Sequence, residues 1–164
     1  MAVPDWAIEA TKYLGSAAVG VIGTKWNERG KRGRMRRHLY KEIANNYGLI
    51  RAGLTNARTK EQTVITGVLP EPLHDEYYDH ARGQVDTYRE LEESYTFDAI
   101  YQRMRTVPND YNDPVKVLTN ALEFTGGVER MLETGILDKR LFFKVAPAWV
   151  QKLLVHRLAH REEP

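Results

Sequence analysis

Residues 31–57 read KRGRMRRHLYKEIANNYGLIRAGLTNA, and this stretch decides the fold. Its apolar residues recur at spacings of three and four, a period that places them on one face of a helix. They are Met35, Leu39, Ile43, Tyr47, Ile50 and Leu54, with Tyr40 and Ala44 beside them. We therefore expect a helix over about residues 31–57 that buries one stripe and continues from the segment before it.

A basic run occupies residues 25–41, across the start of this helix. It contains eight Lys or Arg against the single acid Glu28, a local net charge of +7 in a chain whose net charge is +2. The rest of the chain is therefore net acidic, and the pI of about 8.8 reports one segment. The residues expected to contact an anionic lipid or partner are Lys25, Arg29, Lys31, Arg32, Arg34, Arg36 and Arg37.

An apolar segment precedes the basic run. Residues 13–24 contain no charge, and the segment from Trp6 to Trp26 reaches the roughly 20 residues that a membrane-spanning helix needs. Tryptophan at both ends is typical of an interfacial aromatic belt. Ser16, Gly20 and Thr24 recur every four positions, so in a membrane they would let a second helix approach closely. This pattern favours a membrane anchor whose partner is a membrane protein or a second copy of the chain.

Two alternatives to a spanning helix stay open. Glu9, Lys12 and several glycines weaken the hydrophobicity of the segment, so it could instead lie at the membrane surface or pack on a partner protein. If the helix spans, the positive charge on its C-terminal side places the rest of the chain in the cytoplasm. We expect a single-pass inner-membrane protein with most of the chain cytoplasmic, or a peripheral protein on the cytoplasmic face.

The basic run itself fits more than one partner. Lys and Arg next to an apolar segment each contribute about 1 kcal/mol near an anionic lipid surface, which makes lipid headgroups the expected partner. Nucleic acid also binds short basic runs. No aromatic residue lies between Lys31 and Arg37 for base stacking, and no recognisable nucleic-acid-binding motif follows, so nucleic acid is disfavoured.

A second helix is expected after residues 58–72, which lose the helical period and read as a loop. The start signal is the prolines at 70 and 72, and a break near Thr96 separates a later stretch that ends before Pro108. The predicted buried stripe of this helix consists of Tyr77, Ala81, Val85, Tyr88 and Tyr95.

The third and fourth helices carry clear start and stop signals. Asp113 is a good N-cap, Pro114 suits the first helical position, and Gly135 is a suitable stop. Asp138 then caps a fourth helix, which Pro147 should kink or restart. The predicted inward residues of the fourth helix are Leu141, Val145, Trp149 and Leu153.

These patterns predict an all-α protein with an N-terminal anchor helix that continues into an up-down bundle of about four helices. We divide the chain into a membrane anchor helix at residues 1–27, a basic juxtamembrane collar at 28–41 and a cytoplasmic helical-bundle domain at 42–164. With about 120 residues after the collar, one compact domain is expected.

The third and fourth helices also carry a resemblance. Residues 122–143 read LEFTGGVERMLETGILDKRLFF, and with the helix of Trp149 they resemble the C-terminal half of a loosely related group of small bacterial proteins without assigned function. The anchor and Arg36 to Tyr40 resemble that group more loosely. The resemblance implies a single N-terminal anchor, a basic stretch and a cytoplasmic helical domain, and it supplies no catalytic residues.

Candidate catalytic and metal sites are weak. The absence of cysteine excludes disulfides and thiolate chemistry. His156 and His160 have the i, i+4 spacing of a metal pair, but solvated histidines near a helix end explain them better. Glu71 and His74 have the Glu-x-x-His spacing of di-iron bundles, yet only one copy exists and Pro72 interrupts it. Like His80, they fit an exposed acidic helix start. We therefore expect no catalytic residues, no metal site and no cofactor.

Several other residues are expected to have structural roles only. No carboxylate is expected in an apolar stripe, where a raised pKa would mark an acid or base. The tyrosines are expected to fill the core and to reach polar partners with their hydroxyls, and Gly126-Gly127 is interpreted as a close approach between helices.

The sequence therefore favours a non-enzymatic, membrane-tethered helical scaffold, or an accessory subunit of a membrane complex, on the cytoplasmic face. The alternatives are a helical protein that binds nucleic acid or another anionic partner through residues 29–37, and a cryptic metal-dependent helical-bundle enzyme.

Overall fold

A computed structural model describes the backbone of residues 5–59, 73–107 and 113–159, and within these ranges every regular element is a helix. The side chains of residues 5–26, 56–59 and 114 lie outside the described part. The helices are α1 (Asp5–Thr59), α2 (Glu76–Gly83), α3 (Val85–Arg89), α4 (Ser94–Arg105), α5 (Pro114–Glu133), α6 (Lys139–Val145) and α7 (Ala148–Ala159). The predicted all-α class is confirmed, and residues 60–72, most of the predicted loop, lie outside the described residues.

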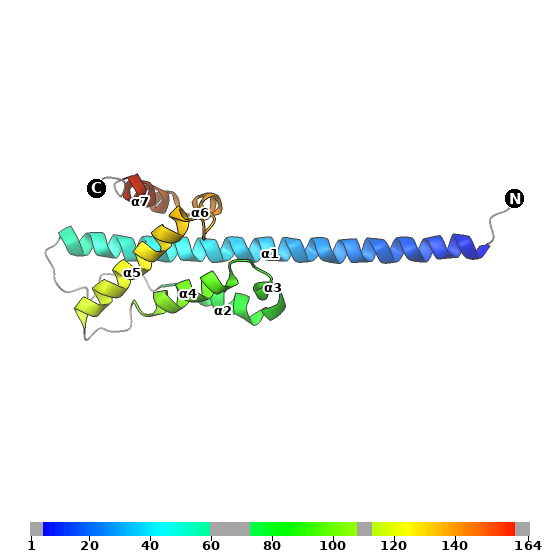
Figure 1. The fold of residues 1–164 in the computed structure, drawn as a ribbon, viewed down its shortest axis with the longest axis horizontal. Coiled ribbons are helices and arrows are strands. Elements are labelled where there is room, and N and C mark those ends of the chain that lie inside the picture. Colours follow the sequence, from blue (N-terminus) through cyan, green and yellow to red (C-terminus); the bar gives the residue numbers. More distant parts are fainter. Residues whose placement is uncertain (1–4, 60–72, 108–112, 160–164) are drawn as a thin grey trace.

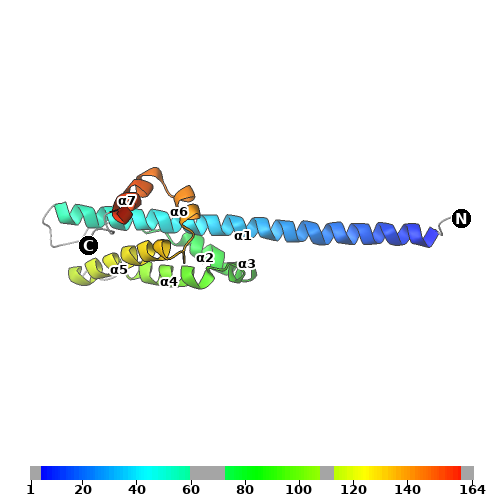
Figure 2. The same ribbon diagram turned by 45° about the horizontal axis from the view of Figure 1, so that its top comes forward.

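Helix α1 is the axis of the molecule. It has 55 residues and is therefore about 80 Å long. The other six described helices gather around its C-terminal half, and its N-terminal half projects beyond them (Figures 1 and 2). The predicted continuity between residues 31–57 and the segment before them is confirmed as one helix.

The core is built on the predicted stripe of α1. Leu39, Ile43 and Tyr47 are fully buried, and Met35, Ile50 and Leu54 are at most 8% exposed. This face packs against α2, α3, α5, α6 and α7. Each of these helices is short and depends on packing for its stability. The long apolar stripe of α1 supplies a packing surface for all of them.

The helix boundaries in the second half follow the predicted signals. The Asp113 carboxylate accepts a hydrogen bond from Lys116 N at 3.0 Å, and the Asp138 carboxylate accepts one from Leu141 N at 3.0 Å. Gly135 has a φ of 77°, which favours glycine, and follows the end of α5. Pro147 lies between α6 and α7, as expected for a residue without an N–H donor.

Two predicted stripes are wrong in part, and in the first the helical period restarts at each break in the chain. The second helix is three helices, with breaks at Gln84 and after Arg89, and Tyr95 is 87% exposed. Val85 is also largely exposed, and Tyr78 is buried where Tyr77 was expected.

In the fourth helix the inward face lies one residue away from the predicted one, before Pro147 as well as after it, so the break does not cause the offset. Phe142, Val150 and Leu154 are fully buried, whereas Trp149 is 45% exposed and Leu141, Val145 and Leu153 are only partly buried.

A third error concerns the glycines. A Cβ added at Gly127 would meet nothing within 4 Å, and one at Gly126 would meet only Arg130, at 3.9 Å, so this pair is not a close helix approach. The close approach is at Gly48, where a Cβ would come too near the Trp149 ring and within 2.5 Å of Val150 Cγ2. Glycine at 48 therefore lets α7 pack onto α1.

Candidate functional site

The basic run does not behave as one surface, because α1 turns its residues toward two different faces. Arg36 lies on the packed face. Its guanidinium Nε donates to Glu93 Oε1 at 2.8 Å, and Nη2 donates to Asp138 Oδ2 at 3.3 Å. The hydrogen bond to Glu93 and the attraction of both acids hold the pKa of Arg36 above its ordinary value. Arg36 thus joins α1 to the start of α4 and to the cap of α6.

Tyr40 completes this junction one turn further along α1. Its hydroxyl donates to Glu93 Oε1 at 3.1 Å and accepts from the Asp138 backbone N–H at 2.7 Å. Burial raises the pKa of Tyr40 well above its ordinary value, so the hydroxyl keeps its proton even in moderately alkaline solution. Arg32 lies on the same face one turn earlier and pairs with Glu90 at 3.0 Å. Two of the predicted contact residues therefore hold the fold together.

The opposite face of α1 carries a basic stripe that consists of Lys31, Arg34, Arg37 and Lys41. All four are exposed, and their spacings of three and four place them along one side of the helix over about 15 Å. Among the described residues, no acid lies within ion-pair distance of any of them. His38, on the same side, stacks on Tyr77 with ring centroids 4.7 Å apart. None of the four takes part in an ion pair of the described fold, although Arg34 lies close enough to Tyr77 to act on it electrostatically.

Five predicted contact residues remain, and the structure describes the side chain of only one of them, Arg29. Arg29 is exposed, and no ion pair joins it to the described residues. Ser16, Gly20, Thr24 and Lys25 lie within α1, but their side chains lie outside the described part. In the part of the chain that is described, no helix combines the length and the hydrophobicity that a membrane crossing requires.

Sequence reasoning missed two buried carboxylates, and the first is Glu42. It is 8% exposed and accepts hydrogen bonds from Tyr77 N at 3.0 Å, Tyr78 N at 3.2 Å and the Tyr101 hydroxyl at 2.6 Å. The two backbone donors are in the first turn of α2, which has no side-chain cap of its own, so Glu42 caps α2 from another helix. Its position beside Ile43 in the apolar stripe of α1 was the available signal.

Asn46, one turn after Glu42, fixes the same segment. Its side-chain oxygen accepts from His74 N at 2.8 Å, and its amide donates to His74 O at 2.5 Å. Together the two side chains hold the chain that enters α2 against α1. Glu42 therefore has a structural role, because its oxygens are occupied by donors of the fold.

The second missed carboxylate is Glu129 of α5, which is 1% exposed. Its Oε1 accepts from the Tyr47 hydroxyl at 2.9 Å and from Arg51 Nη2 at 2.8 Å, and Arg157 Nε lies 3.7 Å away. Burial raises the pKa of Tyr47, so the hydroxyl stays protonated and donates. Glu129 lies on the same face as Thr125 and Val128, and only the surrounding cations make its burial tolerable.

The tyrosines are largely in the core, as predicted. Tyr40, Tyr47, Tyr78, Tyr88 and Tyr101 are at most 5% exposed. The Tyr78 and Tyr88 hydroxyls both donate to Asp98 Oδ1, and burial raises the pKa of Tyr78 to about 12. A tyrosine with a raised pKa keeps its proton. These hydroxyls therefore act as hydrogen-bond donors in the core and are poorly suited to act as catalytic bases.

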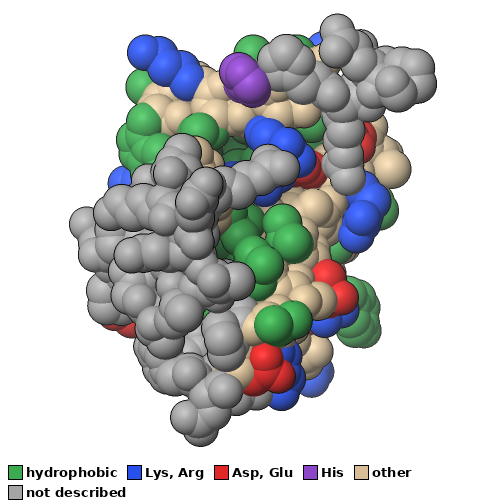
Figure 3. Space-filling model, turned by 90° about the vertical axis from the view of Figure 1, so that its left-hand side faces the viewer, with side chains coloured by type: hydrophobic (Ala, Val, Ile, Leu, Met, Phe, Trp, Pro, Cys, Tyr) green, Lys and Arg blue, Asp and Glu red, His purple; other side chains and the backbone are tan. Residues whose placement is uncertain are grey.

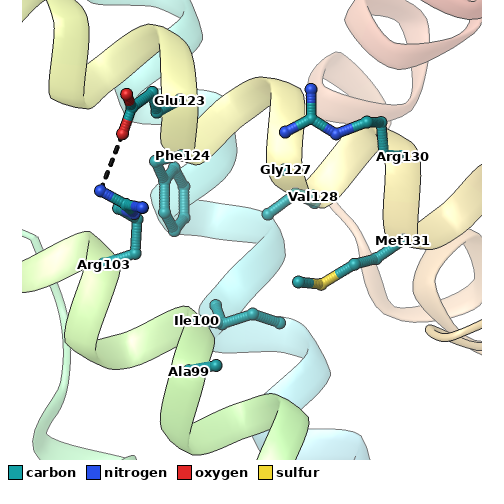
Figure 4. Close-up of a pocket in the computed structure, with 9 residues that line it drawn as sticks. All are labelled: Ala99, Ile100, Arg103, Glu123, Phe124, Gly127, Val128, Arg130 and Met131. Carbon is teal, nitrogen blue, oxygen red and sulfur yellow. Dashed lines mark ion pairs between the residues drawn. The ribbon is translucent and has the colours of Figure 1, made fainter.

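A shallow groove lies between α4 and α5 (Figure 4). Gly127 and the side chains of Ile100, Phe124 and Met131 line it, and the Arg103–Glu123 ion pair, at 2.7 Å, crosses one end. Gly127 borders this open groove, and a Cβ added there would meet nothing within 4 Å. The pair at 126 and 127 therefore makes no close helix contact.

The candidate metal ligands that the structure describes are not brought together. His74 is held by Asn46 through its backbone, His80 approaches the Gln84 amide at 2.9 Å, and His156 lies on α7. Glu71 and His160 lie outside the described residues. Within the described ranges, no three His, Asp or Glu side chains gather in a way that could hold a metal ion.

Comparison with known proteins finds no family model, no curated protein and no solved structure that matches the chain. The resemblance of residues 122–143 to small anchored bacterial proteins stays an expectation.

Proposed function

We propose that this protein is a non-enzymatic helical scaffold or accessory subunit that is held on the cytoplasmic face of the inner membrane. In this proposal the N-terminal part of α1 is the anchor and the basic stripe contacts anionic lipid headgroups. The helices around the C-terminal half of α1 would provide the surface that contacts a partner protein. In the finer form of the proposal, these helices form an up-down bundle.

The observation that carries the proposal is the division of the basic run. Arg32 and Arg36 are paired with acids of the fold, whereas Lys31, Arg34, Arg37 and Lys41 are exposed on the opposite side of α1. Charged residues on a solvent face are common, and the feature that favours an anionic partner here is that residues 31–41 contain no acid to balance the four cations. At about 1 kcal/mol for each residue near an anionic surface, the stripe would supply about 4 kcal/mol, or roughly a thousandfold in partitioning.

The anchor gives the stripe its orientation in this proposal. The stripe begins five residues after Trp26, so a helix inserted through residues 6–26 would bring Lys31 and Arg34 near the headgroup level, and all four cations would reach it where α1 lies along the surface. Ser16, Gly20 and Thr24 would then face a membrane protein or a second copy of the chain. Recovery of the full chain in the soluble fraction of cells at low salt would contradict the anchor.

The stripe is tested separately by replacing Lys31, Arg34, Arg37 and Lys41 with Gln in the full chain. The measurement is co-sedimentation with phosphatidylcholine vesicles that contain or lack phosphatidylserine, at low and at high salt. We expect a loss of about 10²- to 10³-fold in binding to the anionic vesicles, and little change with neutral ones.

A matched control separates position from net charge. Arg89, Lys139, Lys144 and Lys152 are exposed on α3, α6 and α7, and replacing all four with Gln removes the same charge elsewhere. This variant should keep most of the binding to anionic vesicles. Equal loss in both variants would contradict the stripe. Salt-sensitive binding to duplex DNA without preference for anionic vesicles would favour the nucleic-acid alternative.

A further inference from the structure

The end of the molecule where α1 finishes carries an apolar groove, which we call the leucine groove. Leu54 of α1, Leu118 and Leu122 of α5, and Leu153 of α7 line it, and the remaining lining residues are Arg51, Thr55, His156 and Arg157. Its volume is about 730 Å³, within the range of small-molecule sites. Figure 3 views the molecule from this end and shows hydrophobic side chains open to solvent among basic ones.

Two leucines of the groove are unusually exposed. Leu118 is 37% exposed and Leu122 is 49% exposed, although both lie on a helix that contributes Ala121 and Phe124 to the core. Leaving such side chains in water forgoes about 25 cal/mol for each Å² of apolar surface. A ligand with an aliphatic chain would cover them, and among the described lining residues the imidazole of His156 is the only ring.

The inner end of the groove is cationic. Arg51 and Arg157 both line the groove and both approach Glu129, and among the described residues no other acid lies within ion-pair distance of either. Two guanidinium groups therefore share one carboxylate. In both, the Nε atom is buried and has no hydrogen-bond acceptor, although Arg157 Nε lies 3.7 Å from Glu129 Oε1. One further anionic group would balance the charge and accept hydrogen bonds from both.

Along α5, the exposed Leu118 lies eleven residues, or about 16 Å, from Glu129, the acid that Arg51 and Arg157 approach. We infer that the leucine groove binds a medium-chain carboxylate, with its carboxylate at Arg51 and Arg157 and its aliphatic chain along Leu122 and Leu118. This inference goes beyond the proposed membrane scaffold and does not depend on it, because the ligand is soluble.

Titration calorimetry of the full chain with sodium dodecanoate, below its micelle concentration, tests the inference. Dodecanol has the same chain without the charge and serves as the comparison. We expect saturable binding of one dodecanoate for each chain, about tenfold tighter than dodecanol, the difference that one charge-assisted hydrogen bond supplies. The absence of saturable dodecanoate binding, or equal affinity for the two compounds, would overturn the inference.

Three variants assign the binding to this groove. Arg157→Gln should remove most of the preference for dodecanoate, and it leaves the Arg51–Glu129 pair in place. Leu122→Gln should weaken both ligands about tenfold. Val155→Gln is the control, because Val155 is 56% exposed on α7 and does not line the groove. Equal affinities in Leu122→Gln and Val155→Gln, with both folded by circular dichroism, would show that dodecanoate binds elsewhere.

Discussion

Arg36 and Arg37 are neighbours in sequence, but they belong to different parts of the molecule. Arg36 is bound to Glu93 and Asp138 in the junction between α1, α4 and α6. Arg37 is turned about 100° around the helix and is exposed on the basic stripe. A charge count over a basic segment therefore adds together residues with unrelated roles. The position of each residue around the helix axis determines which role it has.

The two faces of α1 should respond oppositely to the same small substitution, and glycine offers the largest effect. Gly48→Ala on the packed face places a Cβ against Trp149 and Val150, and the overpacking costs about 1–3 kcal/mol. Gly33→Ala on the exposed side meets nothing within 4 Å and should stabilise the helix by up to about 1 kcal/mol. Denaturant unfolding of the two variants measures both changes. A gain in stability from Gly48→Ala would mean that α7 does not lie against α1 as described.

The adjacent arginines give the next largest contrast. Arg36→Gln removes the ion pairs with Glu93 and Asp138, and because the Arg36 side chain is 32% exposed we expect a loss of only about 1 kcal/mol in unfolding free energy. Arg37→Gln should change stability by less than about 0.5 kcal/mol, because no described residue pairs with it. Chemical denaturation of both variants under one salt condition makes the comparison. Equal losses would contradict the division of the basic run into two faces.

The parts of the fold that local chemistry controls could be predicted from the sequence. The stripe of α1, the caps Asp113 and Asp138 and the stop at Gly135 each depend on a few neighbouring residues, and all are confirmed. The exact face that a short helix buries could not be predicted. The buried positions around Pro147 keep a spacing of four, at Phe142, Ala146, Val150 and Leu154, and each lies one residue beyond the predicted position.

The candidate site also combines features that the local sequence predicts with long-range contacts that it does not predict. The basic run is visible in sequence, but the partners of Arg32 and Arg36 are acids 58 and 57 residues away. Glu129 is an ordinary acid of α5 in sequence, and it becomes buried only because Tyr47, Arg51 and Arg157 from two other helices surround it. Such contacts depend on how helices pack, which no spacing within one helix encodes.

Of the changes to the packed face, substitution of Asp138 should have the smallest effect on stability, and it tests that face most selectively. Its carboxylate caps α6, and the hydrogen bond from Leu141 N, with Arg36 nearby, lowers its pKa below the ordinary value of 3.8. A carboxylate whose folded pKa is lowered stabilises the fold fully above its unfolded pKa, and this stabilisation disappears as pH falls through the folded pKa. Asp138→Asn keeps a capping oxygen but loses the charge. It should therefore be less stable than the wild type by up to about 1 kcal/mol at neutral pH, and the difference should vanish in acid.

The same measurement in an Arg36→Gln background separates the two causes of that pKa shift. Because the hydrogen bond from Leu141 N is the larger cause, most of the acid-sensitive difference between the chain with Asp138 and the Asp138→Asn variant should persist without Arg36. Denaturant unfolding at several pH values, from neutral to below the ordinary pKa, provides the comparison. A difference that disappears entirely with Arg36 would assign the effect of Asp138 to the ion pair, and the packed face would then be held by charge more than by helix capping.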